Sequence, residues 1–399
     1  MIKLLKYGIY YIFIILCGIF IGLISWSFLF IINTILHFLW LGQEIKGGIL
    51  YHHLLLIPVF IISISMFLAY TYTKFTIIPK PGIMYAKEYQ EYKRVKYRDF
   101  FKIYFLAMLP IIIGASVGPE AALIGLLFMM SSFILDVTKA FESKFKVKLI
   151  KVKREKFKEN LLHNKLYLLK IILLYSSSAS SMLFLLNKDK FPPFNLKLMP
   201  LTINFGDTLI TKGLFVVIAA STFLTVGYYF GKFYHYSEKL IAKLFAYLQN
   251  IYLKMLISSC LLTFFALFLP ILILSGEGTL HILSEQTILK PAFLLIILAF
   301  LKIIITHICL NGNLKGGHIF PIIFSAFLLG SGIGLLLNID LTLAIASVTV
   351  GTTLSIFSSW LGIFLLLALF FPFKFLFILF IIALIFRERL AAEKGSNEL

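Results

Sequence analysis

Two short polar interruptions in otherwise apolar sequence carry the residues best suited to bind an ion. The first covers residues 114–120 and reads GASVGPE, and the second covers residues 316–321 and reads GGHIFP. In both, glycines permit a tight backbone and a proline lies where a first helical turn would begin. A helix that begins in apolar surroundings points free N–H groups, and about half a positive charge, toward whatever lies ahead of it. The two segments together therefore predict an anion site formed by backbone N–H groups.

A simpler interpretation of each segment is a kink, because glycine and proline are common in membrane helices. Either segment alone fits a kink as well as it fits a site. The shared pattern in two halves of one chain favours a transport site, since paired broken segments in matching positions are typical of transporters. Dipolar coordination of this kind is also weak enough to let an ion leave, as conduction requires.

Three ionisable residues lie at or near such interruptions. Glu120 is the one charged residue in the stretch 103–135, and an ionisable residue within the membrane is a functional hypothesis. It is either a gate or proton carrier, or a helix-terminal acid satisfied by its own first turn. Glu277 is either an interfacial residue or part of a proton route. His318 is either structural or a group that responds to ions or pH.

Other chemistry finds little support in the sequence. His307 and Cys309 are two residues apart, so on a helix their side chains point away from each other. We expect no metal site and no cofactor. A polytopic membrane enzyme would usually present a recognisable catalytic set, and the sequence contains no HExxH helix, clustered Asp/His set or nucleophile elbow. A membrane protein with a purely assembling role would not need two interrupted segments.

The elements that position these residues are predicted to be membrane-spanning helices. The 399-residue chain is 60% hydrophobic and 14% charged, with a mean hydropathy of +0.97, whereas soluble proteins are about 25% charged. A spanning helix needs about 20 apolar residues. Apolar segments of that kind lie near residues 7–43, 53–78, 103–135, 166–187, 210–231, 252–275, 291–314, 318–337 and 341–386. The fold class is therefore an all-α polytopic transmembrane protein with broken helices.

The net charge of +19 is explained by the membrane rather than by nucleic acid, which we do not expect as a partner. Lys and Arg gather in polar loops, as cytoplasmic loops do under the positive-inside rule. The most basic segment, residues 139–165, contains ten of them and is expected to be a solvated surface that contacts membrane lipid. The abundance of Lys, Ile, Phe and Leu fits an AT-rich genome, which indicates a bacterial cell membrane.

No Gly/Ser-rich or Pro-rich linker divides the chain. We therefore predict one transmembrane domain over residues 1–386, with repeat halves at about 1–190 and 200–386, and a short polar tail at 387–399. The first apolar segment is too long for a signal sequence and lacks a clean cleavage site, so it is predicted to be retained.

The interrupted segments resemble elements of the CLC family of chloride channels and proton/chloride antiporters. Residues 316–321 are similar to the family's G-G-x-F-x-P element, with Phe320 one place later than usual. Residues 114–120 are similar to its G-[KR]-E-G-P element in a divergent form, and residues 81–84 faintly resemble its G-S-G-I-P element. The resemblance implies an inverted-repeat helical fold, a homodimer, and one path for chloride or a similar anion in each subunit.

The resemblance also implies which residues bind the anion. They are Ser116, Val117, Gly118, Gly317, His318, Ile319, Phe320, Pro81, Gly82 and Ile83. Val117 occupies the place of the family's gating glutamate, and valine can neither compete with an anion nor carry a proton. This difference favours a channel or an uncoupled carrier, whereas Glu120, with Glu277, leaves proton coupling open. A fluoride/proton antiporter is the alternative.

Overall fold

The computed structural model describes a helical chain in two compact units. The described residues are 2–41, 48–75, 78–80, 82–92, 95–144, 172–183, 209–276, 291–357, 360–368, 371, 376 and 379–384. Within them no β-strand occurs, and one isolated β-bridge joins two glycines. The all-α prediction is confirmed.

The first unit comprises residues 1–36, 77–109 and 119–191. Its helices are α1 (Ile2–Leu36), α4 (Gly82–Tyr92), most of α5 (Phe100–Ile112), α6 (Glu120–Lys144) and residues 172–183. α6 packs on both α1 and α4. A hydroxyl pair, Ser27 Oγ and Tyr104 Oη at 2.8 Å, joins α1 to α5.

Small residues bring α1 and residues 172–183 into close contact. A Cβ atom at Gly18 would clash with Ser177, and one at Gly22 would clash with Ser181. Ser181 Oγ also lies 3.4 Å from the Ile19 carbonyl oxygen. Small residues in membrane helices allow backbones to approach each other in this way. Residues 176–181 consist of five serines and one alanine.

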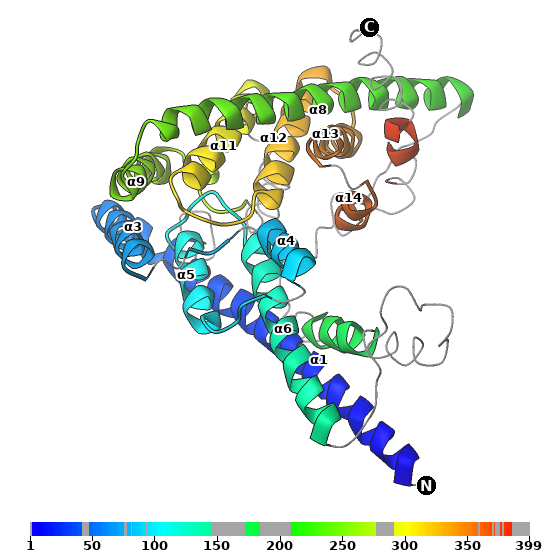
Figure 1. Cartoon of the computed structure of the whole chain (residues 1–399). Helices are drawn as coiled ribbons and strands as arrows, with labels where there is room; N and C mark the ends of the chain where they lie inside the picture. The colour runs from blue at the N-terminus through cyan, green and yellow to red at the C-terminus, as the bar shows by residue number, and fades with distance from the viewer. Residues whose placement is uncertain are drawn as a thin grey trace, which may run out of the picture. The chain divides into compact units, whose positions relative to one another are not determined.

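The second unit comprises residues 37–76, 110–118 and 192–399. Its elements are η1 (His37–Leu41), α2 (Ile49–His52), α3 (Leu56–Phe75), α8 (Leu209–Ala246), α9 (Ile251–Phe268), η4 (Pro270–Leu272), α11 (Ala292–Asn311), α12 (Ile319–Leu337), α13 (Leu341–Ile356) and α14 (Trp360–Leu367). α8 runs across α11, α12 and α13 and makes its most extensive contact with α13 (Figure 1). α12 packs between α11 and α13 and is the most deeply enclosed of the candidate spans.

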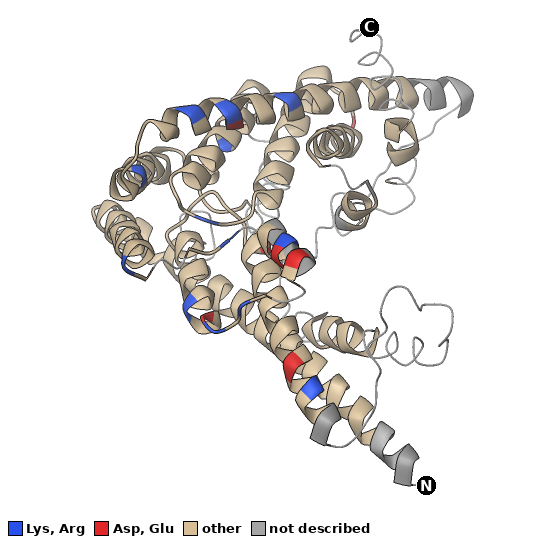
Figure 2. Ribbon diagram, viewed as in Figure 1, with Lys and Arg blue, Asp and Glu red and all other residues tan. Residues whose placement is uncertain are grey.

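Among the described residues, seven helices are long and apolar enough to cross a membrane. Figure 2 shows that charged residues are sparse along the helices. The boundary between α12 and α13 illustrates why the spans end where they do. Asn338 adopts a left-handed conformation (φ 51°) after α12, and the Asp340 carboxylate accepts a 2.9 Å hydrogen bond from the Leu343 N–H at the start of α13. These caps satisfy helix-end groups, as helix termini require.

Candidate functional site

The two interrupted segments meet in the second unit. The first follows the end of α5 at Ile112, and the second joins α11 to α12. The Gly118 N–H donates to the Gly317 carbonyl oxygen at 2.8 Å, and the Gly317 N–H donates to the Gly118 carbonyl oxygen at 2.7 Å. The convergence predicted from their shared Gly…Pro pattern is therefore seen at Gly118 and Gly317.

Glycine is needed where these segments touch. A Cβ atom at Gly316 would lie 2.6 Å from Val117 Cβ, which is closer than real side chains approach. Gly114 has a φ of +84° and packs under the Trp40 ring. Trp40 Nε1 donates a 2.8 Å hydrogen bond to the Ile112 carbonyl oxygen, so the indole satisfies a carbonyl at the end of α5.

A buried pair of hydroxyls lies beside this junction. Ser116 Oγ and Thr306 Oγ1 are 2.8 Å apart, and both residues are almost completely buried. Thr306 Oγ1 also donates to the Lys302 carbonyl oxygen at 2.8 Å. Because Thr306 uses its one hydroxyl hydrogen on that carbonyl, Ser116 is the donor within the pair. Donation to an anion would require one of these two hydrogen bonds to break.

Several of the predicted anion-binding N–H groups already have backbone partners. Val117 donates to the Ala115 carbonyl oxygen at 2.7 Å, and Gly118 and Gly317 donate to each other. An anion ligated at these positions would have to share or replace those bonds. The His318 backbone caps α12, whose first turn contains Ile319 and Phe320.

Comparison with known families identifies the protein family of this chain. Residues 158–386, more than half of the chain, match the family model described as "Voltage gated chloride channel". The chain belongs to this CLC family. It is therefore a multi-pass membrane protein of an anion-transporting, non-enzymatic family. The match includes the second interrupted segment and begins after the first one.

A solved structure shares the CLC fold over nearly the whole chain. It is described as a CLC-type fluoride/proton antiporter and superposes with a TM-score of 0.62, covering 94% of this chain and 93% of that chain at 14% sequence identity. No curated protein matches the sequence. The predicted CLC fold is confirmed at the level of helix arrangement.

The remaining predicted site residues lie in the first unit or outside the described residues. α6 begins at Glu120, which is half-buried in its first turn. α4 begins at Gly82 and continues through Ile83. Pro81 and Glu277 lie outside the described residues, so the roles predicted for them stay predictions.

His318 packs among aromatic rings in this CLC protein. Its ring stacks on Phe357 at 5.8 Å between centroids and lies 6.1 Å from the Tyr234 ring. The Tyr234 ring centroid also lies 4.5 Å from the ring centroid of the buried His307. These contacts support a packing role for His318, and its proposed response to ions or pH stays a prediction. Among the described residues, no His, Cys, Asp and Glu side chains gather in a group of three or more that could hold a metal.

Lys302 is a buried basic residue, bonded to Thr306 of the hydroxyl pair, that the sequence patterns did not single out. It lies near the middle of α11 and is completely buried. Its ammonium nitrogen lies 2.9, 3.4 and 2.5 Å from the carbonyl oxygens of Leu272, Ile273 and Leu274. The available signal was a single lysine within the apolar run 291–314, since a charge inside a spanning segment is rare and usually functional.

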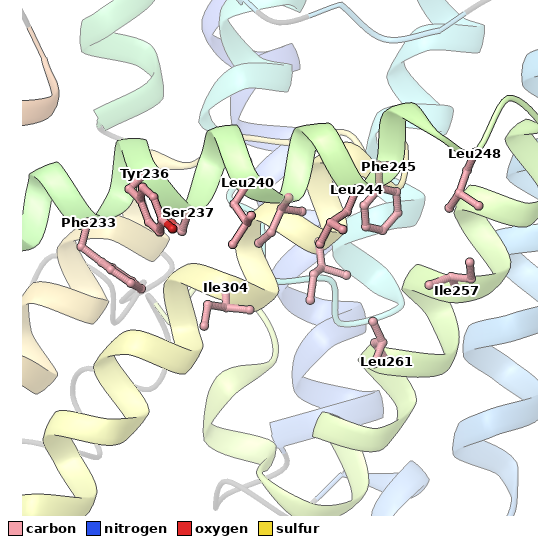
Figure 3. Close-up of a pocket in the computed structure, with 12 residues that line it drawn as sticks. Phe233, Tyr236, Ser237, Leu240, Leu244, Phe245, Leu248, Ile257, Leu261 and Ile304 are labelled. Carbon is pink, nitrogen blue, oxygen red and sulfur yellow. The ribbon is translucent and has the colours of Figure 1, made fainter.

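One hollow elsewhere in the second unit has a different character. It has a volume of about 480 Å³ and lies between α8, α9 and α11 (Figure 3). Its lining is almost entirely apolar, and the Ser237 hydroxyl already donates to the Tyr234 carbonyl oxygen at 2.9 Å. Such a lining suits hydrocarbon rather than an anion.

Proposed function

We propose that this CLC-family protein moves chloride across a bacterial cell membrane, through one path in each subunit of a homodimer. The observation that carries the proposal is the Gly118–Gly317 bridge. It brings both interrupted segments to one buried place, next to the Ser116 and Thr306 hydroxyls. An anion placed there is coordinated by dipoles instead of by a full opposite charge, which allows release as well as binding.

The path runs past residues 116–118 and 317–320 of the second unit, and a contribution of residues 81–83 stays a prediction from the sequence. Val117 is fully buried and apolar, so no carboxylate at that position competes with the anion. Because valine stands where the CLC family has its gating glutamate, we infer that the anion moves passively or without coupling to protons. We assign any proton coupling to Glu120 or Glu277, because a carboxyl group can bind and release a proton.

The test uses purified protein in liposomes loaded with potassium chloride. Valinomycin releases potassium, and chloride efflux through the protein then follows, which a chloride electrode measures. We expect efflux well above that of empty vesicles. Efflux no faster than in empty vesicles would refute the proposal.

Fluoride is the second candidate substrate, favoured by the shared fold with a fluoride/proton antiporter. The same liposomes loaded with potassium fluoride and read with a fluoride electrode separate the two anions. The faster initial rate at equal concentration identifies the preferred substrate.

Proton coupling has its own measurement and variant. Glu120→Gln keeps the size of the side chain and one acceptor oxygen, and it removes the titration. If Glu120 carries protons, we expect anion-driven proton uptake, followed with a pH-sensitive dye, to disappear in this variant while anion efflux continues. Unchanged proton uptake would leave Glu120 as a helix-terminal acid.

A further inference from the structure

Lys302 places a basic amine in the interior of a membrane protein, without an acidic partner among the described residues. None of the ion pairs formed among the described residues includes it. Its three partners are the carbonyl oxygens of Leu272, Ile273 and Leu274. Carbonyls are neutral dipoles, so they solvate the ammonium without cancelling its charge. A net charge at this depth is costly unless something of opposite sign is nearby.

The backbone around this ammonium adopts an unusual conformation that brings three carbonyl oxygens to it. Leu274 has a φ of +61° and Gly276 a φ of +89°. A left-handed conformation is unfavourable for a residue with a Cβ atom, and such strain persists where the surroundings compensate it. Here the turn directs three successive carbonyl oxygens at one nitrogen. The Phe324 ring, with its centroid 5.3 Å from the nitrogen, lies against the same group.

The same turn is bonded directly to the first interrupted segment. The Leu274 N–H donates to the Gly114 carbonyl oxygen at 2.8 Å. On the other side, the Lys302 carbonyl oxygen accepts from Thr306, whose hydroxyl contacts Ser116. The ammonium is therefore connected to Gly114 through the Leu274 backbone. The Lys302 backbone, in turn, is connected to Ser116 through Thr306.

We propose that the Lys302 ammonium is the fixed positive charge of the anion path and attracts an anion held beside Ser116 and the Gly118–Gly317 junction. This inference rests on the proposed anion transport. All three ammonium hydrogens have carbonyl partners, so Lys302 acts through space and does not ligate the anion directly. Attraction of this kind strengthens binding without trapping the ion in a close pair.

A purely structural alternative assigns Lys302 only to the carbonyls of residues 272–274. The two roles separate in Lys302→Gln, whose amide donates to carbonyls but carries no charge, and in Lys302→Arg, which keeps the charge. Lys232→Met is the matched control. Lys232 is exposed on α8, where its ammonium lies 4.8 Å from the Tyr228 ring centroid.

The measurement is the chloride concentration that gives half-maximal efflux, in proteoliposomes of each variant that stays monodisperse. We expect Lys302→Gln to raise this concentration by about tenfold, the size of one charge acting at short range in a partly polarisable interior. Lys302→Arg should remain closer to wild type than Lys302→Gln, and Lys232→Met should match wild type. A folded Lys302→Gln protein with wild-type half-saturation would overturn the inference and leave anion transport intact. Wild-type protein that moves no anion would overturn both.

A second measurement needs no substitution at Lys302, in case the neutral variant does not fold. Crystals of the wild-type protein grown in bromide reveal bound halide by its anomalous scattering. The inference expects a bromide peak near Ser116 and within about 10 Å of the ammonium nitrogen, the range over which a weakly screened charge acts. Bromide bound elsewhere in the chain, with none in that region, would refute it.

Discussion

The two interrupted segments share a sequence pattern but have different surroundings. The first packs under Trp40 at Gly114 and leads to a helix that begins with the acidic Glu120. The second leads into α12, which is enclosed by α11 and α13 and has no acidic residue in its first turn. The pattern of glycine and proline therefore sets the backbone of both segments, while neighbouring residues decide the charge that an anion would meet.

This difference suggests a division of roles. The start of α12 presents the positive end of the helix dipole and has no acidic residue in its first turn, which favours an anion. The start of α6 combines the same dipole with an acid, and the proposed proton transfer at Glu120 would change the charge there. Altering one segment at a time tests whether the two contribute unequally.

The largest effect is expected from Gly316→Ala. The added methyl group would overlap Val117, and overpacking of this kind costs about 1–3 kcal/mol, occasionally more. We expect a lower melting temperature and little anion efflux, because the two segments can no longer pair. Gly8→Ala is the control, since a Cβ atom there meets nothing within 4 Å. Equal stability of the two variants would contradict the close contact at the junction.

A large effect on pH dependence is expected from Val117→Glu. The ionised carboxylate would occupy a fully buried position in the first segment and compete with the anion. We expect efflux to fall by about tenfold at neutral pH and to recover as acid protonates the side chain. Val117→Gln has the same size and should show no such recovery. Identical pH profiles for the two variants would argue that no anion passes this position.

A smaller effect is expected from separating the hydroxyl pair that links the first segment to α11. Ser116→Ala and Thr306→Val each remove one partner of the 2.8 Å contact. In a double-mutant cycle measured by thermal unfolding, we expect a coupling energy of about 0.5–1.5 kcal/mol. A coupling energy near zero would mean that the two hydroxyls stabilise the protein independently.

The smallest effect is expected near residues 81–83, the third predicted anion-binding element. The Lys80 ammonium lies 2.9 Å from the Glu88 carboxylate. Burial raises the pKa of the Glu88 carboxyl, but hydrogen bonds and charge from Lys80 and Lys96 lower it overall. A lowered pKa in the folded state means that this pair stabilises the protein above the unfolded pKa of about 4.3. That contribution disappears as the pH falls through the folded-state pKa.

Glu88→Gln should therefore reduce the melting temperature slightly at neutral pH and have no effect in acid. The loss should stay below about 1 kcal/mol, as for other exposed ion pairs. Glu91→Gln, on the exposed side of the same helix, is the control. A large loss of anion efflux in Glu88→Gln would instead indicate that residues 81–83 contribute as much as the two glycine segments.

The sequence predicted the spans well because charged residues are excluded from the membrane interior. The first interruption was expected at 114–120, and the structure ends α5 at Ile112 and starts α6 at Glu120. The prediction was wrong for the length of α8, which was expected to end near residue 231 and continues to Ala246. Hydropathy marks where a helix leaves the apolar layer, and a helix can continue beyond that point with charged residues.

By itself, the sequence determined the helical class, the positions of the broken segments and the family to which they belong. These features follow from local composition, and from glycine and proline acting on their own backbone. Only the tertiary structure paired Gly118 with Gly317 and surrounded the Lys302 ammonium with three carbonyl groups. Those contacts join residues from separate segments, so no local pattern specifies which donor meets which acceptor.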